Sequence, residues 1–265
     1  MRRAQRRGFG LSVAAFVILA LVLLNPARSD AGLDLDRYAE ILARYTRAVS
    51  DTAGTRVDYA GLQESEAWRE LVESLAESDP TILETRAEKL AFWINAYNIL
   101  AIDAVTRAYP IDSILDEGSF FYSVWKRTAG RVGGRNVTLE EIEHDILRPM
   151  GEPRIHMAIV CASISCPSLR REPWSGAFLD SQFDDSMRGF LADRSKGMSL
   201  DSDAGVIYVS KIFNWFEEDF RFHGGVLAYI TPYVPDADRN WLSQNARDIE
   251  IRYLHYDWNL NDLAR

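Results

Sequence analysis

The chain has little sulfur, little histidine and no apolar run of transmembrane length. Its 265 residues include two cysteines and four histidines. The apolar run at residues 11–24 falls short of the roughly 20 residues that a helix needs to span a bilayer. It follows four arginines and precedes the small-residue segment Ser29-Asp30-Ala31, which is the pattern of a secretory signal. We therefore expect residues 1–31 to be a cleaved signal peptide, with an uncleaved N-terminal anchor as the alternative.

Export would set the redox state that is expected of the two cysteines. No cysteine lies near Ala31, which argues against a lipoprotein anchor. The pair Arg6-Arg7 leaves both the general and the twin-arginine export routes open. Because the periplasm is kept oxidising, a disulfide is the default state of two cysteines there. We predict a periplasmic or secreted protein.

The chain has fewer basic residues than acidic ones. The chain has 30 Lys and Arg against 39 Asp and Glu, and removal of residues 1–31 changes the formal net charge from -9 to -13. A protein this acidic is a poor partner for nucleic acid or for anionic membrane surfaces. We expect a small molecule or a peptide as the partner, no nucleic acid, and no membrane after signal cleavage. The sequence predicts no cofactor.

The mature chain has no internal repeat, low-complexity tract or long linker, so residues 32–265 are expected to form a single domain. Apolar spacing, caps and turn residues predict helices at 35–49, 62–75, 81–109, 138–147, 178–191 and 211–220. Short strands are predicted at 120–125, 131–137, 155–161, 206–209 and 249–254. Helices outnumber strands without regular alternation. The fold class is therefore α+β, mainly helical, around a small mixed or antiparallel sheet.

The helix at 81–109 is apolar on nearly every face of its centre, which predicts a long buried central helix. Asn95 and Asn98 lie within this centre, and buried amides need hydrogen-bond partners. They could orient a catalytic histidine, bind a ligand, or cap a neighbouring loop. The sequence does not decide among these roles.

The segment at 155–169 holds both cysteines and a histidine. As a straight strand it would place His156 and Cys161 on opposite faces, so a Cys/His pair would need a bend or a histidine from elsewhere, such as His144. Four interpretations are open. They are a Cys161–Cys166 disulfide, a reactive or redox-cycling thiol, a metal site that adds His156 and His144, and unpaired packing.

Charged and aromatic clusters add two more candidates. Glu140 and Glu141 lie four and three residues before His144, where either carboxylate could orient the imidazole as a general base, unless this is an ordinary solvated helix face. The segments 215–220 and 256–258 combine aromatic rings with acids, as a sugar-binding platform with catalytic carboxylates would. Burial of Phe213, Phe216 and Phe220 in the core is the alternative.

Four ordered motifs, AFWINAYNIL, TLEEIEHDILR, IHMAIVCASISCPSLR and KIFNWFEEDF, are followed by Tyr256-Asp257-Trp258. With these motifs the chain resembles the family called domain of unknown function 547, over about residues 55–260. The family name implies no reaction. Some plant relatives carry a glutaredoxin-like domain beside this one, which implies a thiol-redox context by association only. The family motifs map here onto Asn95, Tyr97, Asn98, Glu143, His144, His156, Cys161, Cys166, Pro167, Trp215 and Asp219.

We expect a pocket built from the cysteine loop, the Glu-His helix and the amides of the central helix. If the protein is an enzyme, Cys161 would be the nucleophile and His144 or His156 the base, in acyl transfer or thiol exchange. Asn95 or Asn98 would orient the base or the substrate. Glu143 is the remaining candidate catalytic residue. The alternative is a non-catalytic binding or scaffold domain with a structural disulfide.

Overall fold

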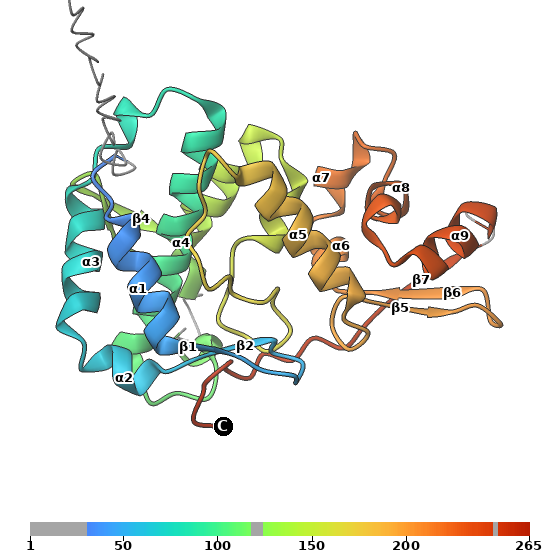
Figure 1. Ribbon diagram of the computed structural model, residues 1–265, viewed down its shortest axis with the longest axis horizontal. Helices are drawn as coiled ribbons and strands as arrows, with labels where there is room; N and C mark the ends of the chain where they lie inside the picture. The colour runs from blue at the N-terminus through green and yellow to red at the C-terminus, as the bar shows by residue number, and fades with distance from the viewer. Residues whose placement is uncertain (1–30, 118–123, 246–248) are drawn as a thin grey trace, which may run out of the picture.

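The computed structural model describes residues 31–117, 124–245 and 249–265. Almost all of the predicted signal peptide, and residues 120–123 of one predicted strand, lie outside the described residues. The fold is α+β and mainly helical, as predicted, although the strands form three small sheets instead of one (Figure 1). Among the described residues, no helix combines the length and apolarity needed to cross a membrane.

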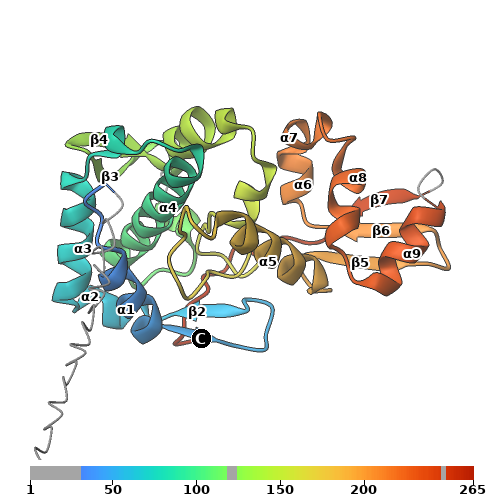
Figure 2. The ribbon, with the colours of Figure 1, turned by 45° about the horizontal axis from the view of Figure 1, so that its top comes forward.

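The first half of the chain builds the larger of two lobes around one helix. Its elements are α1 (Leu35–Tyr45), β1 (Thr46–Ala48), β2 (Thr55–Val57), α2 (Tyr59–Gln63), α3 (Glu66–Glu77), η1 (Pro80–Ile82) and α4 (Arg86–Ala108). A capping box between Thr85 and Glu88 starts α4, and the helix ends before Pro110. Every residue of α4 from Leu90 to Thr106 is buried. The predicted central helix is thus confirmed, and it runs through the middle of the larger lobe (Figure 2).

The next elements cover α4 and carry most of the candidate site. They are η2 (Ile114–Glu117), η3 (Val124–Lys126), β3 (Thr128–Val132), β4 (Arg135–Thr138), the π-helix η4 (Glu141–Leu147), η5 (Arg148–Met150) and η6 (Pro153–Met157). Strands β3 and β4 form an antiparallel hairpin. Thr138 accepts a hydrogen bond from the backbone N–H of Glu141 at 2.9 Å, which is half of the predicted capping box. The described end of the predicted strand at 120–125, by contrast, lies in the short helix η3.

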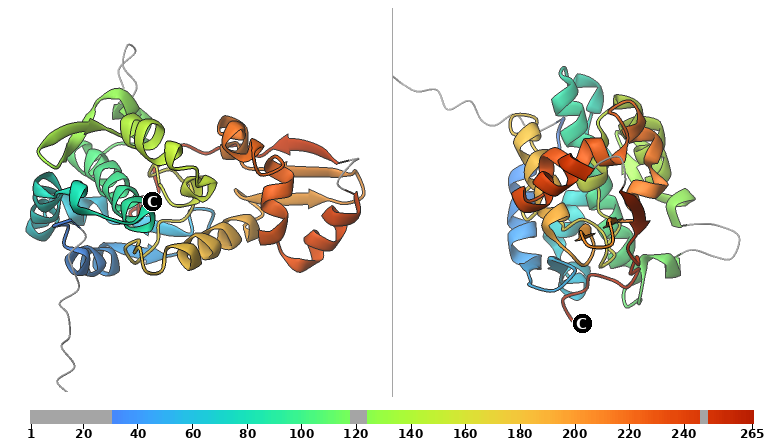
Figure 3. Two further views of the ribbon diagram at one scale, coloured as in Figure 1. Left: turned by 90° about the horizontal axis from the view of Figure 1, so that it is seen from above. Right: turned by 90° about the vertical axis from the view of Figure 1, so that its right-hand side faces the viewer.

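The last third of the chain forms the smaller lobe. It contains α5 (Leu179–Ala192), β5 (Met198–Asp201), β6 (Val206–Val209), α6 (Ile212–Trp215), α7 (Glu217–Arg221), α8 (Val226–Ile230), η7 (Thr231–Tyr233), α9 (Asp236–Asn245) and β7 (Glu250–Tyr253). Strand β6 pairs antiparallel with β5 and parallel with β7, so this sheet is mixed. A second hydrophobic cluster fills the lobe, which extends away from the α4 core (Figure 3).

The C-terminal segment crosses back from the smaller lobe to the larger one. After β7 it passes the cysteine loop and ends beside β2, where Val57 exchanges backbone hydrogen bonds with Asn261 and Leu263 (Figure 1). Both bonds measure 2.9 Å. The two lobes are therefore joined by α5 and by this returning segment, and the cysteine loop lies between them.

The predicted strand at 155–161 is wrong. Residues 153–157 form the short helix η6, and residues 158–161 have no regular structure. Two backbone groups there bind a side chain of α4: Asn98 donates to the carbonyl of Ala158 at 3.0 Å and accepts from the N–H of Val160 at 2.8 Å. An apolar run can be buried against a helix as well as within a sheet, and its pattern alone does not tell the two apart.

Candidate functional site

A pocket of about 400 Å³ lies where α4, the π-helix, the cysteine loop and the C-terminal segment meet. It gathers segments that are more than 150 residues apart in the sequence, from Tyr97 to Trp258. Aromatic rings form much of its wall: Tyr97, Trp125, Trp215, Phe216, Tyr256 and Trp258. Glu140, Glu143, His144, His156 and both cysteines also line it. This composition, mostly apolar with a few converging polar groups, is typical of a small-molecule site.

Cys161 and Cys166 form a disulfide, as the default interpretation predicted. Their Cα atoms lie 6.3 Å apart. Cys161 is half-buried, whereas Cys166 is 4% exposed. Because the sulfurs bond each other, they are not available as metal ligands, and the predicted metal alternative loses two of its four ligands. Within the described residues, no group of three or more His, Cys, Asp or Glu side chains has the geometry to hold a metal ion.

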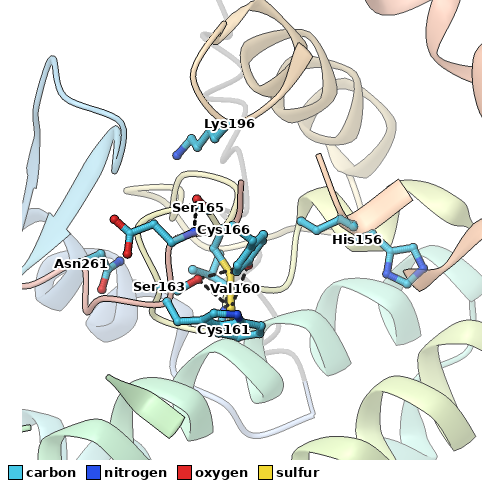
Figure 4. Close-up of a disulfide and its surroundings, with 12 residues drawn as sticks. His156, Val160, Cys161, Ser163, Ser165, Cys166, Lys196 and Asn261 are labelled. Atoms are coloured by element: carbon cyan, nitrogen blue, oxygen red, sulfur yellow. Dashed lines mark hydrogen bonds between the residues drawn. A yellow bond between two sulfur atoms is a disulfide. The ribbon is translucent and has the colours of Figure 1, made fainter. Parts of the chain in front are cut away.

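The sulfur of Cys166 accepts hydrogen bonds from two directions (Figure 4). The backbone N–H of Cys161 donates to it at 3.1 Å, and the hydroxyl of Tyr256 lies 3.2 Å away. The hydroxyl of Ser163 in turn donates to the Tyr256 oxygen at 3.1 Å. Because the Tyr256 oxygen accepts the Ser163 proton, the O–H of Tyr256 can donate to the Cys166 sulfur.

The disulfide loop is fixed by the returning C-terminal segment. The N–H of Ile164 donates to the carbonyl of Asn259, and the N–H of Asn261 donates to the carbonyl of Ala162, both at 2.9 Å. Ala162 has a φ of 64°, a left-handed conformation that is rare for a residue other than glycine. Such conformations persist where the surroundings hold them, and they gather at functional sites.

Asn95 and Asn98 adopt the loop-holding role that the sequence left open. Asn95 exchanges two hydrogen bonds with the backbone of Trp174, at 2.8 and 2.9 Å. Asn98 holds residues 158 and 160 just before Cys161. Both amides are buried, neither lines the pocket, and neither contacts a histidine among the described residues. Asn98 therefore acts on the site by positioning the cysteine loop.

Glu143 supplies a carboxyl group to the pocket from the π-helix, a type of turn that is frequent at functional sites. Its side chain is 13% exposed. Burial raises the pKa of Glu143 to about 7, against the opposing effects of Arg148 and of the Tyr97 hydroxyl, which lies 3.4 Å from the carboxylate. A carboxyl with this pKa can both accept and release a proton near neutral pH.

His144 lies exposed at the pocket and is oriented by an arginine. Arg148 Nη1 lies 2.7 Å from His144 Nδ1, and since arginine only donates, Nδ1 accepts and the proton of the neutral ring is on Nε2. Burial and the Arg148 charge lower the pKa of His144. The predicted orientation by Glu140 or Glu141 is wrong, because these carboxylates pair with Lys126 and Arg135.

His156 is 2% exposed and stacks on the ring of Phe216, with centroids 4.0 Å apart. Its Nε2 lies 2.7 Å from Asp219 Oδ2, and Arg148 binds the same carboxylate through two 2.8 Å hydrogen bonds. Burial lowers the pKa of His156, which outweighs the opposing effect of Asp219. Burial alone would raise the pKa of Asp219, but the hydrogen bonds from His156 and Arg148 hold it well below its usual range.

The predicted nucleophile and bases share the pocket without touching. Within the described part of the chain, neither His144 nor His156 contacts a sulfur atom, and in Figure 4 the His156 ring points away from the disulfide. The groups that do contact sulfur are Tyr256 and Ser163, which were not among the predicted catalytic residues. Arg148 was also missed. Its one sequence signal was its place four residues after His144, one helical turn away.

The aromatic rings of segments 215–220 and 256–258 divide between the hydrophobic core and the pocket wall. Phe213 and Phe220 are fully buried in the smaller lobe. Trp215 stacks on Trp258 at 5.6 Å and packs against Tyr256 at 4.8 Å, and these rings line the pocket. Phe216 lines it too, under His156.

Comparison with known proteins and protein families gives a match to a protein family. Searches of the curated proteins and of the solved structures found no match. A scan against protein-family models matched residues 81–191 to the family described as "Protein of unknown function, DUF547". The matched range contains α4, the π-helix and the cysteine loop, and it ends before Trp215, Asp219 and Tyr256. Residues 81–191 of this chain are therefore a DUF547 family domain.

Proposed function

We propose that this protein catalyses thiol–disulfide exchange, with the Cys161–Cys166 disulfide as its redox group and the aromatic pocket as its substrate site. The observation that carries the proposal is that the disulfide is part of the pocket wall. A disulfide that only closes a loop has no need of a substrate-sized cavity beside it. The substrate would be a small molecule or peptide thiol with an apolar or aromatic part that fits among the rings.

The two sulfurs have different surroundings, which sets the direction of attack. Both cysteines line the pocket, but Cys161 is half-buried, whereas Cys166 is 4% exposed. Hydroxyls of Ser163 and Tyr256 lie 3.2 and 3.4 Å from Cys161 Sγ, but of the two sulfurs only Cys166 Sγ also accepts a backbone N–H from a described residue, besides its closer contact with Tyr256. Donors directed at a sulfur stabilise its thiolate, and a thiol of lower pKa is the better leaving group. A substrate thiolate is therefore expected to attack Cys161 and to expel Cys166.

The proposed exchange takes place in two steps. The substrate sulfur bonds to Cys161 Sγ as the S–S bond breaks, and Cys166 leaves as a thiolate that takes up a proton. A second substrate thiol then attacks the substrate sulfur and releases Cys161. The substrate pair loses two electrons, the protein disulfide gains them, and a further disulfide compound reoxidises the protein.

Glu143 fits the role of proton acceptor for the incoming thiol. It lines the same pocket, and its raised pKa of about 7 is near neutral pH and below the pKa of about 8.5 of an ordinary thiol. A base is most effective when its pKa is near the working pH. The exposed Nε2–H of His144 is a second polar group available to the substrate.

Acyl transfer is supported less well, because it requires a free Cys161 thiolate and a base in hydrogen-bond contact with it. A non-catalytic binding domain is the second candidate. The observation that favours it is the set of hydrogen bonds that fixes the loop to the C-terminal segment, as expected of a rigid recognition loop.

Trapping of the mixed disulfide tests the proposal. The folded wild type is treated with reduced glutathione, and each single-cysteine variant with oxidised glutathione, whose S–S bond supplies the mixed disulfide. All samples are kept at neutral pH, quenched with iodoacetamide and weighed intact. We expect the native disulfide to be reduced, Cys166→Ser to accumulate a mixed disulfide at Cys161, and Cys161→Ser to accumulate far less. A disulfide that resists glutathione until the protein is unfolded would establish the binding-domain alternative instead.

A further inference from the structure

Lys196 is a buried amine that the proposed exchange does not use. It lies in the turn between α5 and β5, it is 2% exposed, and Figure 4 shows it at a distance from the disulfide. Its Nζ donates to the carbonyl of Ala53 at 2.9 Å and to the hydroxyl of Ser168 at 3.3 Å. In the described part of the chain no carboxylate forms an ion pair with it. A buried ammonium without a counter-ion is unfavourable, and such a group shifts toward its neutral form.

Burial lowers the pKa of Lys196 to about 8. The charges of Asp193, in the preceding turn, and of Asp51, in the hairpin between β1 and β2, act in the opposite direction and do not restore the usual value. A neutral amine has a lone pair, and at mildly alkaline pH a large share of Lys196 is able to accept a proton from a neighbour.

Ser168 is that neighbour, and it is exposed on the wall of a second groove of about 470 Å³. This groove shares only Pro167 with the aromatic pocket. The hairpin turn approaches the serine closely: Gly54 has a φ of +69°, and a Cβ atom there would lie 2.1 Å from Ser168 Oγ. Glycine at this position thus makes the contact among Ala53, Ser168 and Lys196 possible.

The groove also offers a positive charge. Arg171 lines it, and its guanidinium binds the Thr46 hydroxyl and the Ala43 carbonyl, at 3.2 and 3.3 Å, without a carboxylate partner among the described residues. Arg170, by contrast, pairs with Glu172 and Asp185. The free charge of Arg171 suits an anionic group on a ligand.

We propose that Ser168 and Lys196 form a second catalytic pair, in which Ser168 is the nucleophile and Lys196 its general base, acting on a carboxylic ester that carries an anionic group. Serine–lysine pairs are one of the arrangements by which a hydroxyl is activated. The proposal does not depend on the disulfide.

The proposed reaction has two stages, acylation of Ser168 and hydrolysis of the acyl-serine. Ser168 Oγ bonds to the ester carbonyl carbon while its proton passes to Lys196 Nζ. The tetrahedral intermediate collapses, the alkoxide leaves, and it takes the proton back from Nζ. Water then attacks the acyl-serine with Nζ as base, which releases the acid and restores the serine.

Labelling with a fluorophosphonate tests the pair, since this reagent forms a Ser Oγ–P bond and releases fluoride. Intact mass and peptide mapping of the full chain should show one adduct at Ser168. The rate of labelling should rise with pH up to about the pKa of Lys196 and then level off. Ser168→Ala should remove the adduct. Ser243→Ala is the control, because Ser243 is exposed on α9 and lines neither this groove nor the aromatic pocket, and this variant should label as the wild type does.

Lys196→Met tests the base directly, because methionine fills a similar volume without a proton-accepting nitrogen. We expect labelling to slow by about 100-fold, the usual contribution of a general base, with an unchanged circular dichroism spectrum. If this variant does not fold, the pH dependence of wild-type labelling tests whether Lys196 is the base. Labelling of other serines in place of Ser168, or a rate at Ser168 that does not level off near the pKa of Lys196, would overturn the proposal.

Discussion

The hydroxyl of Tyr256 lies 3.2 Å from Cys166 Sγ and 3.4 Å from Cys161 Sγ, so that one side chain contacts both atoms of the disulfide. These residues are 90 and 95 positions apart in the sequence. The contact exists because the C-terminal segment returns across the cysteine loop.

Tyr256→Phe should slow reduction of the native disulfide. The substitution keeps the ring and removes the hydrogen bond to the leaving sulfur, which we expect to contribute about 1.4 kcal/mol, or a factor of about 10 in rate. The measurement is the second-order rate constant for reduction by dithiothreitol at pH 7. Tyr109→Phe is the control and should leave the rate unchanged, because the Tyr109 hydroxyl binds the Asp262 carboxylate and not a sulfur. Equal rates in Tyr256→Phe and wild type would show that the hydroxyl does not assist exchange.

Glu143→Gln should stabilise the protein at alkaline pH. Burial raises the pKa of Glu143 to about 7 in the folded state, above its unfolded value of about 4.3. The contribution of this carboxyl to stability is therefore fully present below about pH 4.3 and is lost as pH rises through 7. Since the carboxylate is slightly exposed, we expect a gain of about 1–3 kcal/mol at pH 8 and little change at pH 4. Urea unfolding at both pH values measures it. The same variant should reduce the exchange rate, and a fall in stability at pH 8 would contradict the assigned protonation.

Asp219→Asn should destabilise the protein near neutral pH by about 2–3 kcal/mol, because it leaves Arg148 and His156 without their shared carboxylate. The depressed pKa of Asp219 fixes the pH dependence: its contribution is present above the unfolded-state pKa of about 3.9 and is lost as pH falls. The difference in unfolding free energy between the variant and the wild type should therefore shrink below pH 4. A difference that stays constant from pH 7 to pH 3 would show that the charge is not involved.

Asn98→Ala and Asn95→Ala form a matched pair. Each removes a buried amide that makes two backbone hydrogen bonds, so each should cost about 2–4 kcal/mol in urea unfolding. Only Asn98 holds the segment before Cys161. We expect Asn98→Ala alone to change the rate of disulfide reduction, measured under conditions where both variants remain folded. A similar change in both would mean that the rate follows global stability.

Several features of this protein could be predicted from local patterns. The helix α4 was predicted at 81–109 from a run that is apolar on nearly every face of its centre, and the structure has it at Arg86–Ala108. Burial of that run required partners for Asn95 and Asn98, and the structure provides them. Helix period and capping residues are properties of short segments, and the sequence alone determined them.

The arrangement of the site was decided by the tertiary structure. Residues 155–161 have the apolar pattern of a strand, but the side chain of Asn98 takes the hydrogen bonds that a neighbouring strand would have supplied. Arg148 binds His144, whereas Glu140 and Glu141 pair with Lys126 and Arg135, which come from other segments.

The contact of Tyr256 with the disulfide, and that of Lys196 with Ser168, depend on chain segments that meet only after folding. The sequence determined that the centre of α4 is helical and buried, and that two cysteines five residues apart are near enough to bond. The fold decided which polar groups face those sulfurs and which amine lacks a counter-ion, because burial and hydrogen-bond geometry depend on distances across the chain that no local pattern contains.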